Sequence, residues 1–170
     1  VLVANRGYRP FVRKGRPADR RVAVLVADLD QARSLAVVDG RTIALAEVAW
    51  PGPLTMVLPT APGSDEATVG VRCPDHALVQ AVAMSVGPIA TTSANRSGDP
   101  TPADAASAAA SLGGDLLVLD DGRCTGMPST VVDLTVDPAV ILREGTFTAA
   151  DLEAAGIRVE PGSAGPGDDR

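Results

Sequence analysis

Residues 54–73 read LTMVLPTAPGSDEATVGVRC, and their pattern indicates the fold class. Two apolar segments, 54–60 and 67–73, flank a turn-forming Pro-Gly-Ser sequence, a pattern that is typical of a β-hairpin. A hairpin makes its two strands antiparallel, while the helical patterns around it are typical of α/β proteins. The chain is therefore predicted to be an α/β domain with a twisted, mixed sheet.

The rest of the chain alternates short apolar segments with helical patterns. Residues 22–27 predict a buried strand, and Asp28 predicts the N-cap of a helix over 28–38 that Asp39-Gly40 ends. For the Ala-rich helix that ends near 112, Thr101 is the N-cap candidate, with a proline at N1 and an acid at N3. Further strands are expected at 89–92, 116–119, 130–134 and 140–142, and further helices at 42–50, 74–86 and 148–155.

The helix that Pro74-Asp75 opens is expected to bury one apolar stripe. That stripe consists of Ala77, Leu78, Ala81, Val82 and Ser85. No repeat or linker divides the chain, so residues 1–157 are expected to form one domain. Residues 158–170 are expected to be a disordered tail, since they are dominated by glycine, proline and aspartate.

Composition excludes several classes of protein. With 170 residues, 45% hydrophobic and 21% charged, the chain has a globular composition, and its apolar runs are too short to cross a bilayer. Two cysteines and one histidine exclude zinc and disulfide frameworks, so no protein-held metal is expected, and Cys73 is expected in the core. Only 2% of residues are aromatic, which argues against base stacking. We expect a cytoplasmic protein without membrane association.

Charge is distributed unevenly along the chain. The net charge is -6, yet the first 21 residues hold seven of the 15 basic residues and a single acid. Within that stretch, Lys14-Gly15-Arg16-Pro17 sets two cations around a glycine, and Lys14 is the chain's only lysine. Such a pair can hold a polyphosphate, because arginine supplies a fork and lysine a point charge. The alternative is a solvated basic segment.

Other polar residues lie at the ends of predicted strands. Ser93 and Asn95 belong to a polar loop after strand 89–92, a position where open α/β sheets bind ligands. Thr68 and Arg72 are four residues apart in one strand and therefore share a face. Ser129 and Arg143 lie at two further strand ends. The alternatives are an ordinary polar turn and surface salt bridges. Neither a P-loop nor a Rossmann fingerprint is present.

Six motifs occur in a fixed order along residues 10–150. They are KGRP at 14–17, WPGPLT at 50–55, TVGVRCPDH at 68–76, TSANRSG at 92–98, PSTVVD at 128–133 and ILREG at 141–145. Together they resemble the YrdC-like family of threonylcarbamoyl-AMP synthases in its short, single-domain form. The resemblance implies a twisted sheet with flanking helices around a concave, positively lined cavity.

The resemblance also implies an enzyme, a nucleotidyltransferase that joins L-threonine, bicarbonate and ATP into threonylcarbamoyl-adenylate and pyrophosphate. Mg²⁺ would accompany ATP, and the product would pass to a tRNA threonylcarbamoyl-transfer complex to make threonylcarbamoyladenosine in tRNA. Lys14 and Arg16 match the family's catalytic K-x-R motif. By the same matching, the ATP-binding residues are Lys14, Arg16, Thr68, Ser93, Asn95, Thr101 and Arg143. The threonine-binding residues are Arg72, Thr91, Ser93 and Ser129.

The chain departs from the family pattern at one place. Family members carry a strand and a loop of the type Pro-Thr-Glu/Asp-Thr-x-Tyr-Gly-Leu before the K-x-R motif, and residues 1–10 do not match it. A missing strand would expose a sheet edge and remove part of the threonine pocket. Two alternatives therefore stay open. One is a non-catalytic module that binds double-stranded RNA or tRNA through its basic N-terminal residues, and the other is a degenerate relative that only binds nucleotide.

Overall fold

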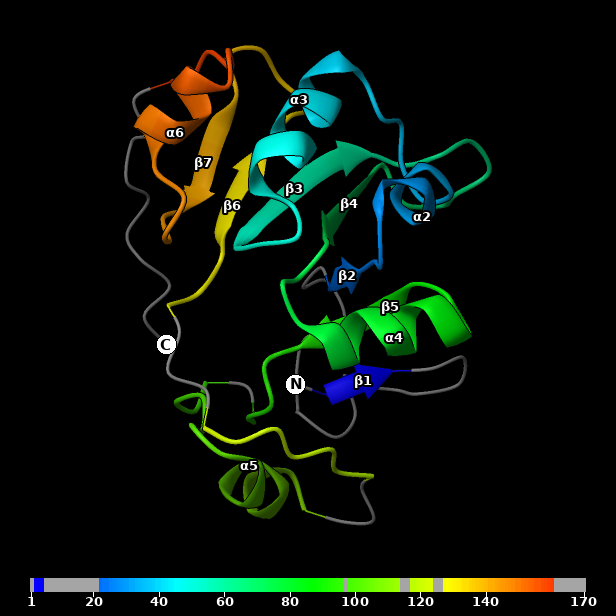
Figure 1. Ribbon diagram of the computed structural model, residues 1–170, viewed down its shortest axis with the longest axis vertical. Coiled ribbons are helices and arrows are strands. Elements are labelled where there is room, and N and C mark those ends of the chain that lie inside the picture. The colour runs from blue at the N-terminus through cyan, green and yellow to red at the C-terminus, as the bar shows by residue number, and fades with distance from the viewer. Residues whose placement is uncertain (1, 5–21, 97, 114–116, 124–126, 161–170) are drawn as a thin grey trace.

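The computed structural model describes residues 2–4, 22–96, 98–113, 117–123 and 127–160. Within these residues, seven strands form a single mixed sheet in the order β1-β5-β2-β4-β3-β6-β7 (Figure 1). The strands are β1 (Leu2–Ala4), β2 (Ala23–Leu25), β3 (Leu54–Pro59), β4 (Thr68–Arg72), β5 (Ile89–Thr92), β6 (Thr130–Asp133) and β7 (Val140–Arg143). The predicted α/β class is confirmed.

The pairing of the strands follows from the central hairpin. β3 and β4 are antiparallel, with Met56 opposite Val71, as the sequence of 54–73 predicts. β2 pairs with β4 and β3 pairs with β6 in parallel, and the remaining neighbours are antiparallel. The sheet is therefore mixed, and its centre is the hairpin.

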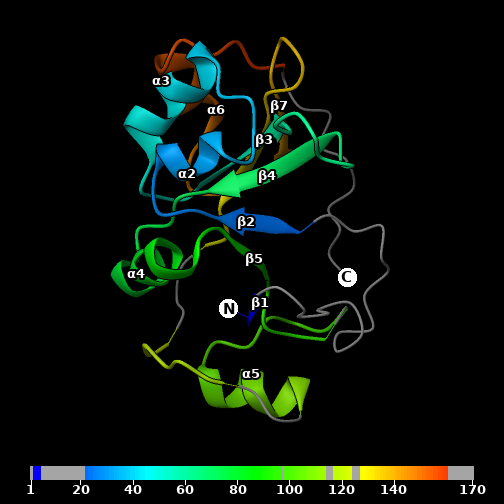
Figure 2. The same cartoon turned by 90° about the vertical axis from the view of Figure 1, so that its right-hand side faces the viewer.

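Three helices cover one face of this sheet. They are α2 (Leu29–Arg33), α3 (Gly40–Ala49) and α6 (Ala149–Ala154), and Figure 2 shows α2 and α3 together beside β4. Leu45 of α3 and Leu152 of α6 share a buried apolar cluster with Met56, Val71 and Val132 of the strands. Each of these five side chains has no exposed surface. Burial of this cluster is the main apolar contribution to folding, since each such side chain contributes about 1.5–3 kcal/mol.

α4 (Ala77–Val86) packs on a different part of the sheet. A second buried cluster joins Ala83 of this helix to Leu25 of β2 and Ile89 of β5. Leu25 pairs with both Ile89 and Arg72, so these side chains lie on the face opposite to that of Val71. α5 (Ala105–Leu112) lies apart from the other helices in both views (Figures 1 and 2). No described helix is both long and apolar enough to span a membrane.

The helix predicted over 28–38 is shorter than expected. Asp28 is its N-cap, as predicted, and accepts from the backbone N–H of Gln31 at 2.8 Å. α2 nevertheless ends at Arg33, because the backbone of the next residues pairs with the end of β3, where Ala36 bridges to Thr60. Asp39 does not end a helix but caps the start of α3.

Two helix details predicted from the sequence are wrong. α4 buries Ala83, with Val79 and Val82 beside it, instead of the predicted stripe, in which Ala77, Leu78, Ala81 and Ser85 are exposed. The sheet contact through Leu25 and Ile89 selects this other stripe. α5 is capped by Asp104, which accepts from the backbone N–H of Ser107 at 2.8 Å, and not by Thr101.

The strand predicted at 116–119 is also wrong for its described part. Residues 117–119 are exposed and belong to no strand, because no neighbouring strand pairs with them. Conversely, β1 was not predicted, and it pairs antiparallel with β5 through Val3 and Thr91. Of the tail predicted over 158–170, residues 158–160 are described, and Val159 forms a parallel bridge with Ala139. Residues 161–170 lie outside the described residues.

Candidate functional site

The predicted site residues of the strands gather on the face opposite α2 and α3. Register places Arg143 of β7 beside Val131 of β6, and Val131 beside Thr55 of β3. In the hairpin, Met56 pairs with Val71, so their chain neighbours Thr55 and Arg72 lie opposite each other. Paired residues point to the same face of a sheet. One row across four strands therefore holds two arginines and a threonine.

Arg143 and Ser129 form the best-defined contact of this face. Nε and Nη2 of Arg143 donate to the carbonyl oxygen of Ser129 at 3.0 and 2.8 Å, and Nη2 also donates to its hydroxyl at 3.0 Å. Partial burial lowers the pKa of the Arg143 guanidinium, which stays cationic at neutral pH. Arg143 makes no ion pair with any carboxylate of the described residues. A fixed cation without a carboxylate partner is suited to bind an anion.

Gly145 makes this contact possible. The chain after β7 crosses directly over the peptide of Ser129, and a Cβ at Gly145 would lie 2.7 Å from the carbonyl carbon of Ser129. The same Cβ would also clash with Pro128 and Thr130. Glycine in the ILREG motif is therefore required by a close approach of two backbone segments.

Thr55 is a site residue that the sequence analysis missed. Its hydroxyl lies 2.8 Å from the hydroxyl of Ser129, and the two residues are only 5% and 4% exposed. The available signal was a single threonine in an otherwise apolar strand, within the WPGPLT motif. Buried hydroxyls need hydrogen-bond partners, and Thr55 finds its partner in Ser129.

Ser93 and Asn95 form a second polar group in the loop after β5. The hydroxyl of Ser93 donates to Oδ1 of Asn95 at 2.6 Å, and the Asn95 amide donates to the backbone carbonyl of Asp99. Asn95 is buried, so this loop is fixed by its own side chains. The two predicted residues are therefore in direct contact, and their role in binding stays a prediction.

The remaining predicted strand residues share the same sheet face. Thr68, Gly70 and Arg72 alternate along β4, and Gly70 and Thr91 both pair with Ala23 of β2. The hydroxyl of Thr68 is buried and has no hydrogen-bond partner among the described residues. Arg72 donates from Nε to the carbonyl oxygen of Gly52 at 2.9 Å, which ties β4 to the WPGPLT segment.

Not every predicted residue joins this arrangement. Thr101 is exposed in the segment before α5, and no hydrogen bond or ion pair of the described residues links it to the others. Lys14 and Arg16 lie outside the described residues, so their positions stay predictions.

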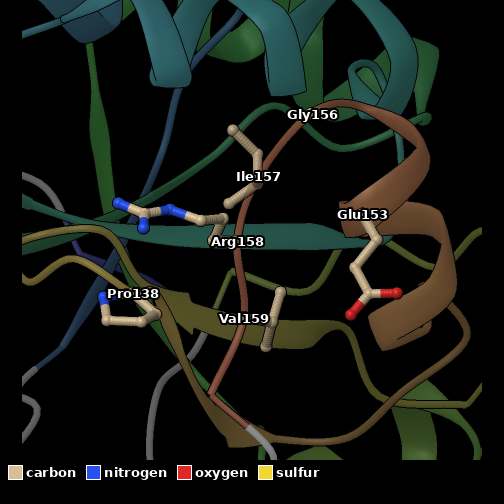
Figure 3. A pocket seen from close by; sticks show the side chains of 6 residues that line it. All are labelled: Pro138, Glu153, Gly156, Ile157, Arg158 and Val159. Atoms are coloured by element: carbon tan, nitrogen blue, oxygen red, sulfur yellow. The ribbon is translucent and has the colours of Figure 1, made fainter.

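A hollow elsewhere on the molecule contains none of the predicted residues. Figure 3 shows it between the start of β7 and the end of α6, and its lining includes Pro138, Glu153 and Val159. Arg158, which also lines it, forms an exposed ion pair with Asp137 at 2.8 Å. Because none of the predicted residues lines this hollow, the sheet face that carries Arg143 is the better candidate site.

Fold and site together define the chain as an α/β protein whose sheet carries two arginines and a buried hydroxyl pair on one face. Residues 8–145 match the model of the family Sua5_yciO_yrdC, described as "Telomere recombination". The chain belongs to this Sua5/YciO/YrdC family, as the sequence motifs predict.

Curated relatives of known name support the assignment. The chain is 38% identical to a threonylcarbamoyl-AMP synthase of Pyrococcus abyssi over 95% of its own length and 51% of that protein. It is also 38% identical to a threonylcarbamoyl-AMP synthase of Bacillus subtilis, over 83% of its length and 44% of the relative. The chain thus spans about half the length of these relatives.

Solved structures agree with the fold. The crystal structure of P. abyssi Sua5 complexed with L-threonine superposes with a TM-score of 0.80 at 36% identity, covering 89% of this chain and 48% of that one. Escherichia coli YciO superposes with a TM-score of 0.63 at 24% identity, covering 80% of this chain and 71% of YciO, which supports the fold alone.

Proposed function

We propose that this chain is an L-threonylcarbamoyladenylate synthase, which serves the threonylcarbamoyladenosine modification of tRNA. The observation that carries the proposal is the Arg143, Ser129 and Thr55 arrangement on a sheet face. It occurs in a chain 38% identical to a threonylcarbamoyl-AMP synthase, and a structure of P. abyssi Sua5 contains L-threonine. A reaction that consumes ATP and bicarbonate suits the cytoplasm.

The proposed reaction has two bond-forming steps. The amino nitrogen of L-threonine bonds to the carbon of bicarbonate with loss of water. An oxygen of the resulting carbamate then attacks the α-phosphorus of ATP, and the bond to the bridging oxygen breaks so that pyrophosphate leaves. Such a reaction needs alignment and charge neutralisation more than a protein nucleophile.

We assign the residues of the site to two tasks, charge neutralisation and alignment of the substrates. Lys14 and Arg16 would hold the triphosphate, while Arg72 and Arg143 would hold the threonine carboxylate or a phosphate. Ser93 and Ser129 would donate hydrogen bonds to the substrates. Arg143 enters this role already oriented, because three of its hydrogen bonds go to Ser129.

Mg²⁺ is proposed as part of the ATP substrate. The described residues contain no group of three or more histidine, cysteine or acidic side chains that could hold a metal ion. As the counter-ion of ATP, Mg²⁺ would neutralise phosphate charge.

Pyrophosphate release tests the proposed function. The chain is incubated with ATP, Mg²⁺ and bicarbonate, with and without L-threonine, and the adenylate is identified by mass spectrometry. Threonine-dependent release that Lys14→Ala abolishes is the expected result. ATP binding without threonine-dependent release would contradict the synthase and indicate a nucleotide-binding relative.

RNA binding is tested in parallel by titrating tRNA and double-stranded RNA at several salt concentrations. A binding module would lose affinity steeply with salt and would depend on Arg6, Arg9, Arg13 and Arg20. If the chain is a synthase, replacing these four arginines by glutamine should instead leave the threonine-dependent pyrophosphate release, which requires Lys14, unchanged.

A further inference from the structure

The hydroxyl pair of Thr55 and Ser129 is an unusual feature of the core. Thr55 lies between Leu54 and Met56, both fully buried, and it is itself 5% exposed. A valine would have nearly the same shape there and no hydroxyl to satisfy. Burying a hydroxyl costs free energy unless it is hydrogen-bonded, so a threonine at this position requires a hydrogen-bond partner.

Hydrogen-bond accounting limits what each group of this pair can do. Nη2 of Arg143 can only donate, so the Ser129 oxygen accepts from it at 3.0 Å. The Thr55 hydroxyl has one side-chain partner in the described residues, the Ser129 hydroxyl at 2.8 Å. Either hydroxyl can donate across this contact, and in either case one hydroxyl hydrogen has no acceptor among the described residues. With Thr55 donating, that hydrogen belongs to Ser129, beside the Arg143 guanidinium, where a bound anion can accept it.

This arrangement leaves the hydrogen of Ser129 available. Its oxygen accepts two hydrogen bonds, one from Thr55 and one from the charged Arg143. Two accepted bonds polarise a hydroxyl and strengthen the bond that it donates. The Arg143 Nη1 group likewise has no partner in the described residues. The Ser129 hydroxyl and Nη1 of Arg143 can therefore both donate to one acceptor.

Other buried threonines show the contrast. The hydroxyl of Thr130 donates to the carbonyl oxygen of Phe147 at 2.6 Å and accepts from the Phe147 backbone N–H at 3.1 Å. Thr42 donates to the carboxylate of Asp39 at 2.8 Å. Both of these hydroxyl hydrogens find acceptors in the protein. In the Thr55 and Ser129 pair, one hydrogen remains for an external acceptor.

We propose that Thr55 is a positioning residue that fixes the Ser129 hydroxyl as a hydrogen-bond donor to an anionic oxygen held by Arg143. The inference rests on the proposed function, in which that oxygen belongs to the carboxylate of threonine or to a phosphate of ATP. Thr55 itself does not touch the substrate. It acts through the orientation of Ser129.

The test compares Thr55→Val with Thr55→Ser. Valine keeps the shape and removes the donor, whereas serine restores the donor with less packing. Calorimetric titrations with L-threonine and, separately, with ATP and Mg²⁺ identify which anion is concerned. Thr55→Val is expected to weaken one of the two ligands roughly tenfold, and Thr55→Ser to restore most of that affinity. Thr42→Val removes another buried hydroxyl and is expected to lower stability without changing either affinity.

A double-variant cycle separates positioning from stability. If Thr55 acts through Ser129, Thr55→Val adds no further loss of affinity once Ser129→Ala is present. Additive losses in the two variants would overturn the proposal, as would Thr55→Val binding both ligands like the unmodified chain. If the chain binds a ligand with this coupling but releases no pyrophosphate, the positioning role stands and the synthase fails. A chain that binds neither ligand overturns both.

Discussion

The guanidinium of Arg143, at the end of β7, binds both the backbone carbonyl and the side-chain hydroxyl of Ser129, which directly precedes β6. Nε and Nη2 converge on the Ser129 carbonyl oxygen at 3.0 and 2.8 Å, and Nη2 also reaches the hydroxyl at 3.0 Å. A planar guanidinium can make these bonds together, because its donors are fixed in one fork. The cation and the hydroxyl are therefore held together as one rigid unit.

Arg143→Lys should reduce activity much more than stability. Lysine keeps the charge but cannot bind the carbonyl and the hydroxyl of Ser129 together. We predict at least a tenfold fall in threonine-dependent pyrophosphate release, in line with the loss of a charged hydrogen bond, roughly 1.5–3 kcal/mol. The melting temperature should change little, since Arg143 lies at the end of β7 and belongs to neither buried apolar cluster.

Arg158→Lys is the matched control for this prediction. Arg158 forms an exposed ion pair with Asp137, and its replacement should leave pyrophosphate release unchanged. Equal activity of the Arg143→Lys variant and the unmodified chain would show that the fork geometry does not matter.

Gly145→Ala should disturb both folding and the site. The added methyl group would clash with backbone atoms of Pro128, Ser129 and Thr130, none of which is the end of a flexible side chain. We predict a loss of about 1–3 kcal/mol in the free energy of unfolding, measured by urea denaturation. Gly40→Ala is the control: a Cβ there meets nothing within 4 Å, and alanine in α3 should raise stability by about 0.5–1 kcal/mol. Equal effects of the two variants would contradict the clash.

Asp39 predicts a pH dependence of stability. Burial alone would raise the pKa of its carboxyl, but hydrogen bonds from the Thr42 backbone, the Thr42 hydroxyl and Arg41 outweigh it and lower the pKa from the usual 3.8. A carboxyl with a lowered pKa stabilises the fold above its unfolded pKa, and this contribution is lost as the pH falls through the folded value. Asp39→Asn should therefore cost up to about 1 kcal/mol at pH 7.

The difference in the free energy of unfolding between the Asp39→Asn variant and the unmodified chain should shrink as the pH falls below 3.8. Urea denaturation at a series of pH values measures it. Asp65→Asn serves as the control, because Asp65 is exposed and its side chain makes no hydrogen bond or ion pair within the described residues. A pH-independent difference at Asp39 would show that charge has no part in this cap.

Local sequence rules predicted the elements of this chain where tertiary contacts agree with them. The hairpin of β3 and β4, the strand β5 and the capped start of α2 follow from apolar segments, turn residues and an N-cap aspartate. The end of α2 does not, because Ala36 pairs with Thr60 at the far end of β3. The buried stripe of α4 is likewise set by Leu25 and Ile89, which no local pattern connects to that helix.

The same limit applies to the site. Strand-end positions predicted Ser129 and Arg143 individually, and the structure joins them by hydrogen bonds. Thr55 was missed because its role depends on Ser129, 74 positions away in the sequence, and a single threonine in a strand carries no sign of that partner. Pairing register, which sequence alone does not give, brings the two together.

Cys73 should behave as a protected thiol. It is 2% exposed, and its Sγ donates to the carbonyl oxygen of Ala27 at 3.2 Å. Burial raises the pKa of the thiol, and the nearby carboxylate of Asp28 raises it further, so little thiolate forms at neutral pH. In a Cys124→Ala variant, where Cys73 is the only thiol, disulfide-exchange reagents should react at least about 100-fold more slowly than with the same variant in denaturing urea, because reaction requires opening of the fold. Complete reaction of the folded variant within the mixing time at pH 7 would contradict the burial of Cys73, which lies in the segment that joins β4 to α4 along the chain.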